Sequence, residues 1–162
     1  MSPDKAAIKK YLLLFALALA ALTASNGWAR VRIANTAGLA FGSFAAGAGG
    51  TVIVSPAGVR SKTGGVLLVT SPVNAASFNV TRATGACNQT YTITLPANGT
   101  VTLTSGANSM AVNNFVSNPS GNGQLQFPSC SQVLTVGATL TVAVGQATGN
   151  YNGTFPVTVV FP

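Results

Sequence analysis

The strongest constraint on the fold is the two-residue alternation over residues 151–161. Odd positions there are mainly aromatic or β-branched, and even positions are mainly polar or small. This period is typical of a β-strand with one face on a core and the other in solvent. The large residues expected on the inner face are Tyr151, Phe155, Val157, Val159 and Phe161. The pattern predicts a terminal strand that must pair with an earlier strand or with another chain.

The chain between residue 30 and this strand favours β-structure throughout. Short β-branched runs are separated by Gly, Asn, Ser and Pro, and no useful helical period follows residue 29. The spacing predicts an antiparallel β-sandwich in one domain, residues 30–162. Asn98-Gly99 between two alternating runs predicts a hairpin over residues 90–104. We further expect a polar turn at residues 61–65, a strand buried on both faces at 66–69, and a core position for Phe127.

Residues 1–29 have the composition of a secretory signal peptide. Three lysines precede an apolar run at residues 11–24, which is shorter than the ~20 residues that span a bilayer. Gly27 and Ala29 supply the small residues of a cleavage site. An uncleaved membrane anchor is the alternative interpretation. Cleavage after Ala29 would leave no integral membrane segment and would direct the chain to the periplasm, then to the cell surface or outside.

The predicted mature chain lacks the residues that most catalysis needs. Asp4 is the only acidic residue in the sequence, and there is no His. General acid–base chemistry and metal binding draw on His, Asp, Glu or several Cys, so we expect no enzyme activity, no cofactor and no metal. The five remaining cations, Arg30, Arg32, Arg60, Lys62 and Arg82, are scattered. They form no nucleic-acid footprint.

Two cysteines, Cys87 and Cys130, remain in an exported chain. An even pair in an oxidising compartment predicts a structural disulfide. A redox pair would more often be a close CxxC motif. We therefore expect the two thiols to be joined.

Five short motifs resemble a known family: residues 39–44 (LAFGSF), 49–52 (GGTV), 76–78 (ASF), 90–93 (TYTI) and 149–155 (GNYNGTF). They resemble a bacterial exported family of unknown function (DUF4402), similar to Mat/Ecp fimbrial subunits and spore coat protein U domains. The resemblance implies an immunoglobulin-like, pilin-like sandwich that lacks its final strand. In such subunits a neighbour's N-terminal segment fills a groove beside the C-terminal strand. Val31 and Ile33 would be donor residues here, and the inner face of residues 151–161 would line the groove.

Two hypotheses follow from these observations. The first is an exported, non-enzymatic fimbrial or coat-like subunit that assembles with further copies through strand addition, with a periplasmic chaperone and an outer-membrane usher as partners. The second is a self-contained, monomeric β-sandwich that binds carbohydrate or another surface ligand. Pro156 favours the second hypothesis, because a residue without N–H suits an edge better than a strand paired on both sides.

Overall fold

The computed structural model describes residues 31–82 and 87–162, so the predicted signal peptide and Arg30 lie outside the described residues. Every regular element in these residues is a β-strand. The largest sheet contains seven strands: β1 (Val31–Ala37), β3 (Gly50–Val54), β4 (Arg60–Gly64), β6 (Ala76–Arg82), β8 (Val101–Ser105), β9 (Asn108–Asn118) and β11 (Ser131–Val142). A second sheet has the order β10 (Asn122–Gln124), β7 (Thr90–Thr94) and β12 (Thr158–Val160). A short pair joins β2 (Phe44–Ala45) to β5 (Leu67–Leu68).

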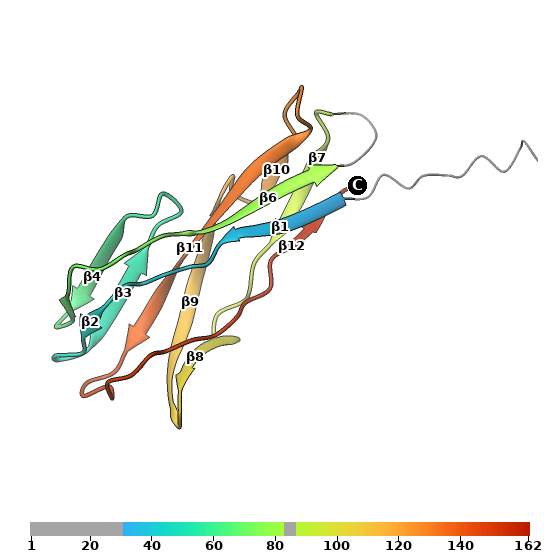
Figure 1. Ribbon diagram of the computed structural model, residues 1–162. Coiled ribbons are helices and arrows are strands. Elements are labelled where there is room, and N and C mark those ends of the chain that lie inside the picture. Colours follow the sequence, from blue (N-terminus) through green and yellow to red (C-terminus); the bar gives the residue numbers. More distant parts are fainter. Residues whose placement is uncertain (1–30, 83–86) are drawn as a thin grey trace, which may run out of the picture.

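The long strand β11 organises the larger sheet, and it runs through the middle of the molecule in Figure 1. Strands β6 and β3 pair with successive parts of one edge of β11, and β9 pairs with the other edge. All these pairings are antiparallel, as predicted. The sequence suits this position because β-branched residues alternate along β11 and its inward side chains are buried. The fold is therefore an all-β, immunoglobulin-like sandwich.

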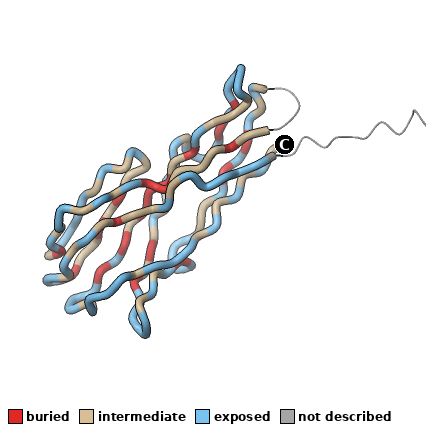
Figure 2. The backbone as a smooth tube through the Cα atoms, in the orientation of Figure 1, coloured by how far each residue is buried: buried red, intermediate tan, exposed pale blue. Residues whose placement is uncertain are grey.

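The interior consists of two packed clusters of apolar side chains. The first includes Phe41, Val112 and Leu140, and the second includes Tyr91 and Leu134. Leu39, Phe115 and Phe155 pack against both clusters. Figure 2 shows the buried positions along the inner strands, whereas the C-terminal segment is intermediate or exposed. The sandwich is thus more completely closed in its centre than along this segment.

The predicted hairpin over residues 90–104 is wrong. Strand β7 pairs with β10 and β12, whereas β8 pairs with β9 in the other sheet. The hairpin is β8–β9, with Gly106 at a φ of 58° in its two-residue loop. The Asn98 side chain instead accepts the Asn114 N–H at 2.7 Å, and Asn113 accepts the Gly99 N–H at 2.8 Å. Asn98 and Gly99 therefore attach the connection between the two sheets to β9.

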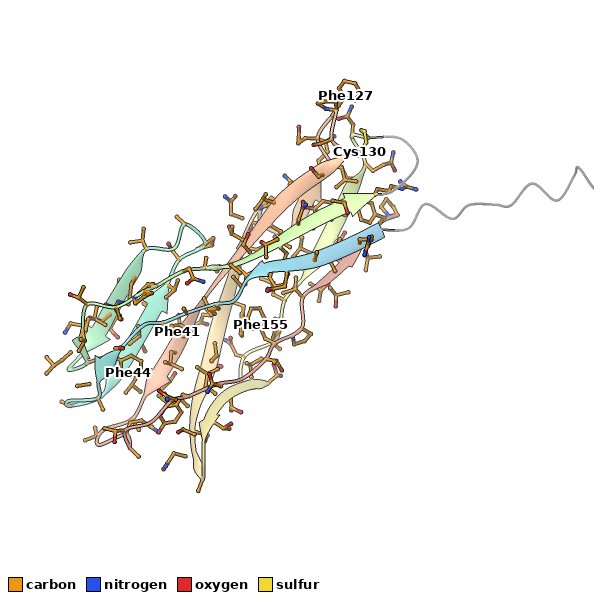
Figure 3. All side chains as sticks on the ribbon, viewed as in Figure 1. Phe41, Phe44, Phe127, Cys130 and Phe155 are labelled. Carbon is orange, nitrogen blue, oxygen red and sulfur yellow. A yellow bond between two sulfur atoms is a disulfide. The ribbon has the colours of Figure 1, made fainter. Side chains whose placement is uncertain are left out.

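Three smaller predictions are also corrected. The expected polar turn is the edge strand β4, which pairs with β3. The run at residues 66–69 buries Val66 but leaves Leu67 and Val69 exposed. Phe127 is 74% exposed and lies at the tip of the molecule in Figure 3. An apolar residue type alone does not decide burial, because folded proteins keep much apolar surface in water.

Tyr91 anchors the second cluster and gives the stability a predictable pH dependence. Its hydroxyl donates to the Gln132 side-chain oxygen at 2.6 Å, and its ring lies 5.2 Å from that of Phe161. Burial raises the pKa of the Tyr91 hydroxyl above its usual value of 10.0. The folded state therefore keeps the proton more tightly than the unfolded state does. Stability from this group is complete below the unfolded pKa and is lost as pH rises through the folded pKa.

We expect the free energy of unfolding to vary little between about pH 5 and pH 9 and to fall above about pH 10. Residues 31–162 contain no Asp, Glu or His that would titrate in the lower range. Urea denaturation at several pH values measures this. Tyr91→Phe should cost about 1 kcal/mol at neutral pH and make the alkaline fall shallower. An equally steep fall in both proteins would assign the alkaline sensitivity to other groups.

Candidate functional site

An apolar groove of about 990 Å³ lies between two segments that are far apart in the sequence. One side, here called the N-terminal wall, is residues 38–46. The other, the C-terminal wall, is residues 146–155. The floor consists of inward side chains from the larger sheet: Phe78, Val101, Leu103, Met110, Val112 and Leu140. Figure 3 shows Phe41 and Phe44 on one side of this region and Phe155 on the other.

The N-terminal wall is held from behind by Arg60. The guanidinium donates to the carbonyl oxygens of Phe41 at 3.1 Å, Ser43 at 3.2 Å and Val69 at 2.7 Å. Ala40 exchanges two backbone hydrogen bonds with Asn74. A charged donor that bonds several carbonyls forms stronger hydrogen bonds than neutral groups do. This wall therefore keeps its shape without a strand partner on its groove side.

The C-terminal wall is attached to β8 through a single residue. Asn152 and Thr104 exchange backbone hydrogen bonds of 2.8 and 3.0 Å. A Cβ at Gly153 would lie 2.5 Å from the Thr102 carbonyl oxygen, so glycine permits this close approach. Within the described residues, Asn152 is the only member of residues 147–157 with a backbone–backbone hydrogen bond. The groove is therefore bordered by a backbone edge that pairs on one side only.

The alternation predicted for the terminal strand is confirmed in burial but not in strand length. Large odd-numbered side chains from residue 151 to residue 161 are partly buried, and the even-numbered ones are exposed. Regular pairing is limited to β12, which pairs with β7. Tyr151 and Phe155 line the groove, whereas Val157, Val159 and Phe161 pack against the second cluster beyond it.

The residues predicted as strand donors lie outside the groove. Val31 and Ile33 belong to β1, where they are paired with Arg82 and Val80 of the same chain. Ile33 faces the same side as the buried Val80 but stays 38% exposed. Strand β1 is an edge strand because it pairs with β6 alone. In the structure, the expected donor segment is therefore paired with a strand of its own chain.

The predicted disulfide between Cys87 and Cys130 is confirmed. It connects the start of the β7 region to the turn before β11, at the tip opposite the groove. Backbone hydrogen bonds from Asn88 to Leu125 and from Leu125 to Gln89 fix the same turn. The disulfide therefore stabilises the end of the sandwich that contains the second cluster.

The sequence did not reveal two features of the site. From the sequence, residues 38–46 have no predicted structural role beyond a family motif, and Arg60 is counted only as a scattered charge. The alternation of Leu39 and Phe41 was a usable signal for one wall. No local signal places Arg60 behind that wall, because its carbonyl partners come from two distant segments.

Among the described residues that line the groove there is no His, Cys, Asp, Glu or Lys. The residues that line the groove include no charged side chain. Across residues 31–82 and 87–162 there is no cluster of three or more His, Cys, Asp or Glu side chains. The same part of the chain contains no helix of the length and hydropathy needed to cross a membrane. The arrangement can bind an apolar or extended partner.

Within its described residues, the protein is thus an antiparallel β-sandwich in which the backbone edge of the C-terminal wall is unpaired beside the apolar groove. The chain belongs to the family described as a domain of unknown function (DUF4402), whose model matches residues 31–161. No curated protein and no solved structure matches the chain.

Proposed function

We propose that the protein is an exported structural subunit without enzymatic activity, which assembles with further copies by β-strand addition. One observation carries the proposal: the apolar groove is bordered by a backbone edge that has no partner on its groove side within the described residues. An added strand would satisfy these backbone groups and cover the apolar floor at once. Backbone hydrogen bonds would supply affinity and alternate side chains would supply specificity.

The distribution of charge supports this edge as the place of assembly. Exposed sheet edges are commonly protected from unwanted pairing by charged side chains. Edge strand β4 carries Lys62, and edge strand β1 carries Arg32, both exposed. The described residues 146–162 carry no charged side chain. Two edges of the larger sheet are thus protected by charge, whereas the edge beside the groove carries none; the other uncharged edge, β10, is only three residues long.

Strand β1 of a neighbouring copy is the donor that we propose, with Val31 and Ile33 facing the acceptor. Residues 32–36 are exposed on their own sheet, so release of β1 would uncover little apolar surface. Gly38 follows β1, and a Cβ there would meet no atom within 4 Å, which leaves room for a hinge. The resemblance to fimbrial and coat subunits supports export, a periplasmic chaperone and usher, and a final position at the cell surface.

The test uses a matched pair of substitutions in β8. Leu103 lines the groove, and its neighbour Thr104 is exposed on the opposite face. Leu103→Lys should weaken both self-association and binding of a synthetic peptide of residues 31–39 by more than tenfold, because burial of an unpaired charge is costly. Thr104→Lys should change both by less than about threefold. Light scattering after size exclusion and fluorescence anisotropy measure the two effects.

The monomeric hypothesis makes the opposite prediction for the same samples. The mature chain would stay monomeric at all concentrations and would have no affinity for the peptide. Circular dichroism of the Leu103→Lys variant checks that it is folded. A mature chain that neither associates nor binds the peptide would overturn the proposed function.

A further inference from the structure

The orientation of the backbone can be determined at two separate places in the C-terminal segment. At the first, Asn152 both donates to and accepts from Thr104. The N–H and C=O of Asn152 therefore point toward β8. Because successive residues of an extended strand point these groups to opposite sides, those of Tyr151 and Gly153 point to the free side.

The second place is β12. Ile93 of β7 donates to the Gly121 carbonyl at 2.8 Å, on the β10 side. The polar groups of its neighbours Thr92 and Thr94 therefore point to β12, where their partners are Val160 and Thr158. At both places, the backbone N–H and C=O groups of even-numbered residues thus point toward the chain's own sheets. We expect the backbone groups of the odd-numbered residues between these two places to point to the free edge as well, because burial alternates without a break over residues 154–160.

Pro156 does not interrupt this series of backbone groups on the free edge. It is even-numbered, so its missing N–H would have pointed toward the chain's own sheets. The register of the flanking pairs Thr104–Asn152 and Thr94–Thr158 sets Pro156 opposite residues 95–100, which lie between the end of β7 and the start of β8 and belong to no strand. At this position in the alternation, Pro156 is compatible with a partner strand on the free edge, although the sequence alone favours a strand that is paired on one side only.

We infer that the docking surface is the continuous backbone edge from Tyr151 to Val159, which extends past the groove, and that its partner is an extended segment of about nine residues from a second copy. This inference rests on the proposed function. At about 3.3 Å per residue, the edge is about 30 Å long. Side chains of the partner that face inward must be apolar at alternate positions, because the edge's own inward side chains are apolar and no charge lines the groove.

Hydrogen exchange of the mature chain, measured by NMR with and without the peptide of residues 31–39, tests the inference. In the free protein, the amides of Asn152, Thr158 and Val160 should exchange slowly and those of Phe155, Val157 and Val159 rapidly. Saturating peptide should slow exchange at Phe155, Val157 and Val159 by at least tenfold. Slow exchange at Val157 and Val159 without peptide would overturn the inferred orientation.

Two outcomes with peptide separate this inference from the proposed function. Protection that is confined to Gly153 and Phe155 would mean that the surface ends with the groove, which overturns the inference and keeps strand addition. No change anywhere in residues 151–161 would overturn both.

Substitutions provide a second measurement of the same edge. Val157→Pro removes an edge donor and should weaken peptide binding at least tenfold relative to Val157→Ala, which keeps the N–H. Pro156→Ala should leave binding within about twofold of the parent chain. Equal binding by the Val157→Pro and Val157→Ala variants would contradict a bond from Val157 to the partner.

Discussion

Replacing Cys87 and Cys130 together with alanine is expected to lower the free energy of unfolding by about 4 kcal/mol. The disulfide joins residues separated by 43 positions, so its loss frees a long loop in the unfolded chain. A change of this size should lower Tm by roughly 10–20 °C in a domain of this length. Urea denaturation of residues 30–162, followed by circular dichroism, measures the difference.

The reduced parent protein is the matched control for the double variant. Reduction frees the same loop, so the two samples should unfold at similar urea concentrations. The groove lies in the other half of the sandwich, and peptide affinity at low temperature should therefore change little. A loss below about 1 kcal/mol in both samples would show that residual order in the unfolded state already restricts this loop.

The second large effect is expected for Phe155→Ala. The Phe155 ring lies 4.9 Å from that of Phe115 and 6.5 Å from that of Phe78, and it packs against both clusters. Truncation of a fully buried Phe costs about 3–5 kcal/mol. Because Phe155 is only partly buried, we expect a loss of about 2–3 kcal/mol in urea denaturation.

Pro156→Ala is the control, because the Pro156 side chain is exposed. This substitution should change the free energy of unfolding by less than about 1 kcal/mol. Phe155→Ala should also weaken peptide binding, because it removes apolar surface from the C-terminal wall. A loss of stability below 1 kcal/mol would mean that the C-terminal segment is poorly attached to the core. The groove would then lack one of its fixed walls.

The terminal segment illustrates how far the sequence predicts the site. Alternation from residue 151 to residue 161 assigned inner and outer faces correctly, because a period of two fixes which side chains share a face. It did not predict that regular pairing would be limited to β12. Asn98-Gly99 illustrates the opposite case. This strong turn signal predicted a hairpin, but the two residues lie in a connection between the two sheets. Local turn chemistry permits a hairpin, but the pairing of distant strands decides whether one forms.

Three properties follow from the sequence alone: the all-β class, the pairing of the two cysteines and the scarcity of charge along residues 146–162. These properties depend on composition and on the period of the side chains, which the chain carries locally. Three others appear only in the folded molecule: the strand partners, the pairing of β1 with β6 and the groove between residues 38–46 and 146–155. The folded molecule also places Arg60 behind the N-terminal wall, and it places Pro156 where its missing N–H lies away from the free edge. Such features depend on contacts between segments far apart in the chain, and a two-residue period specifies faces without specifying partners.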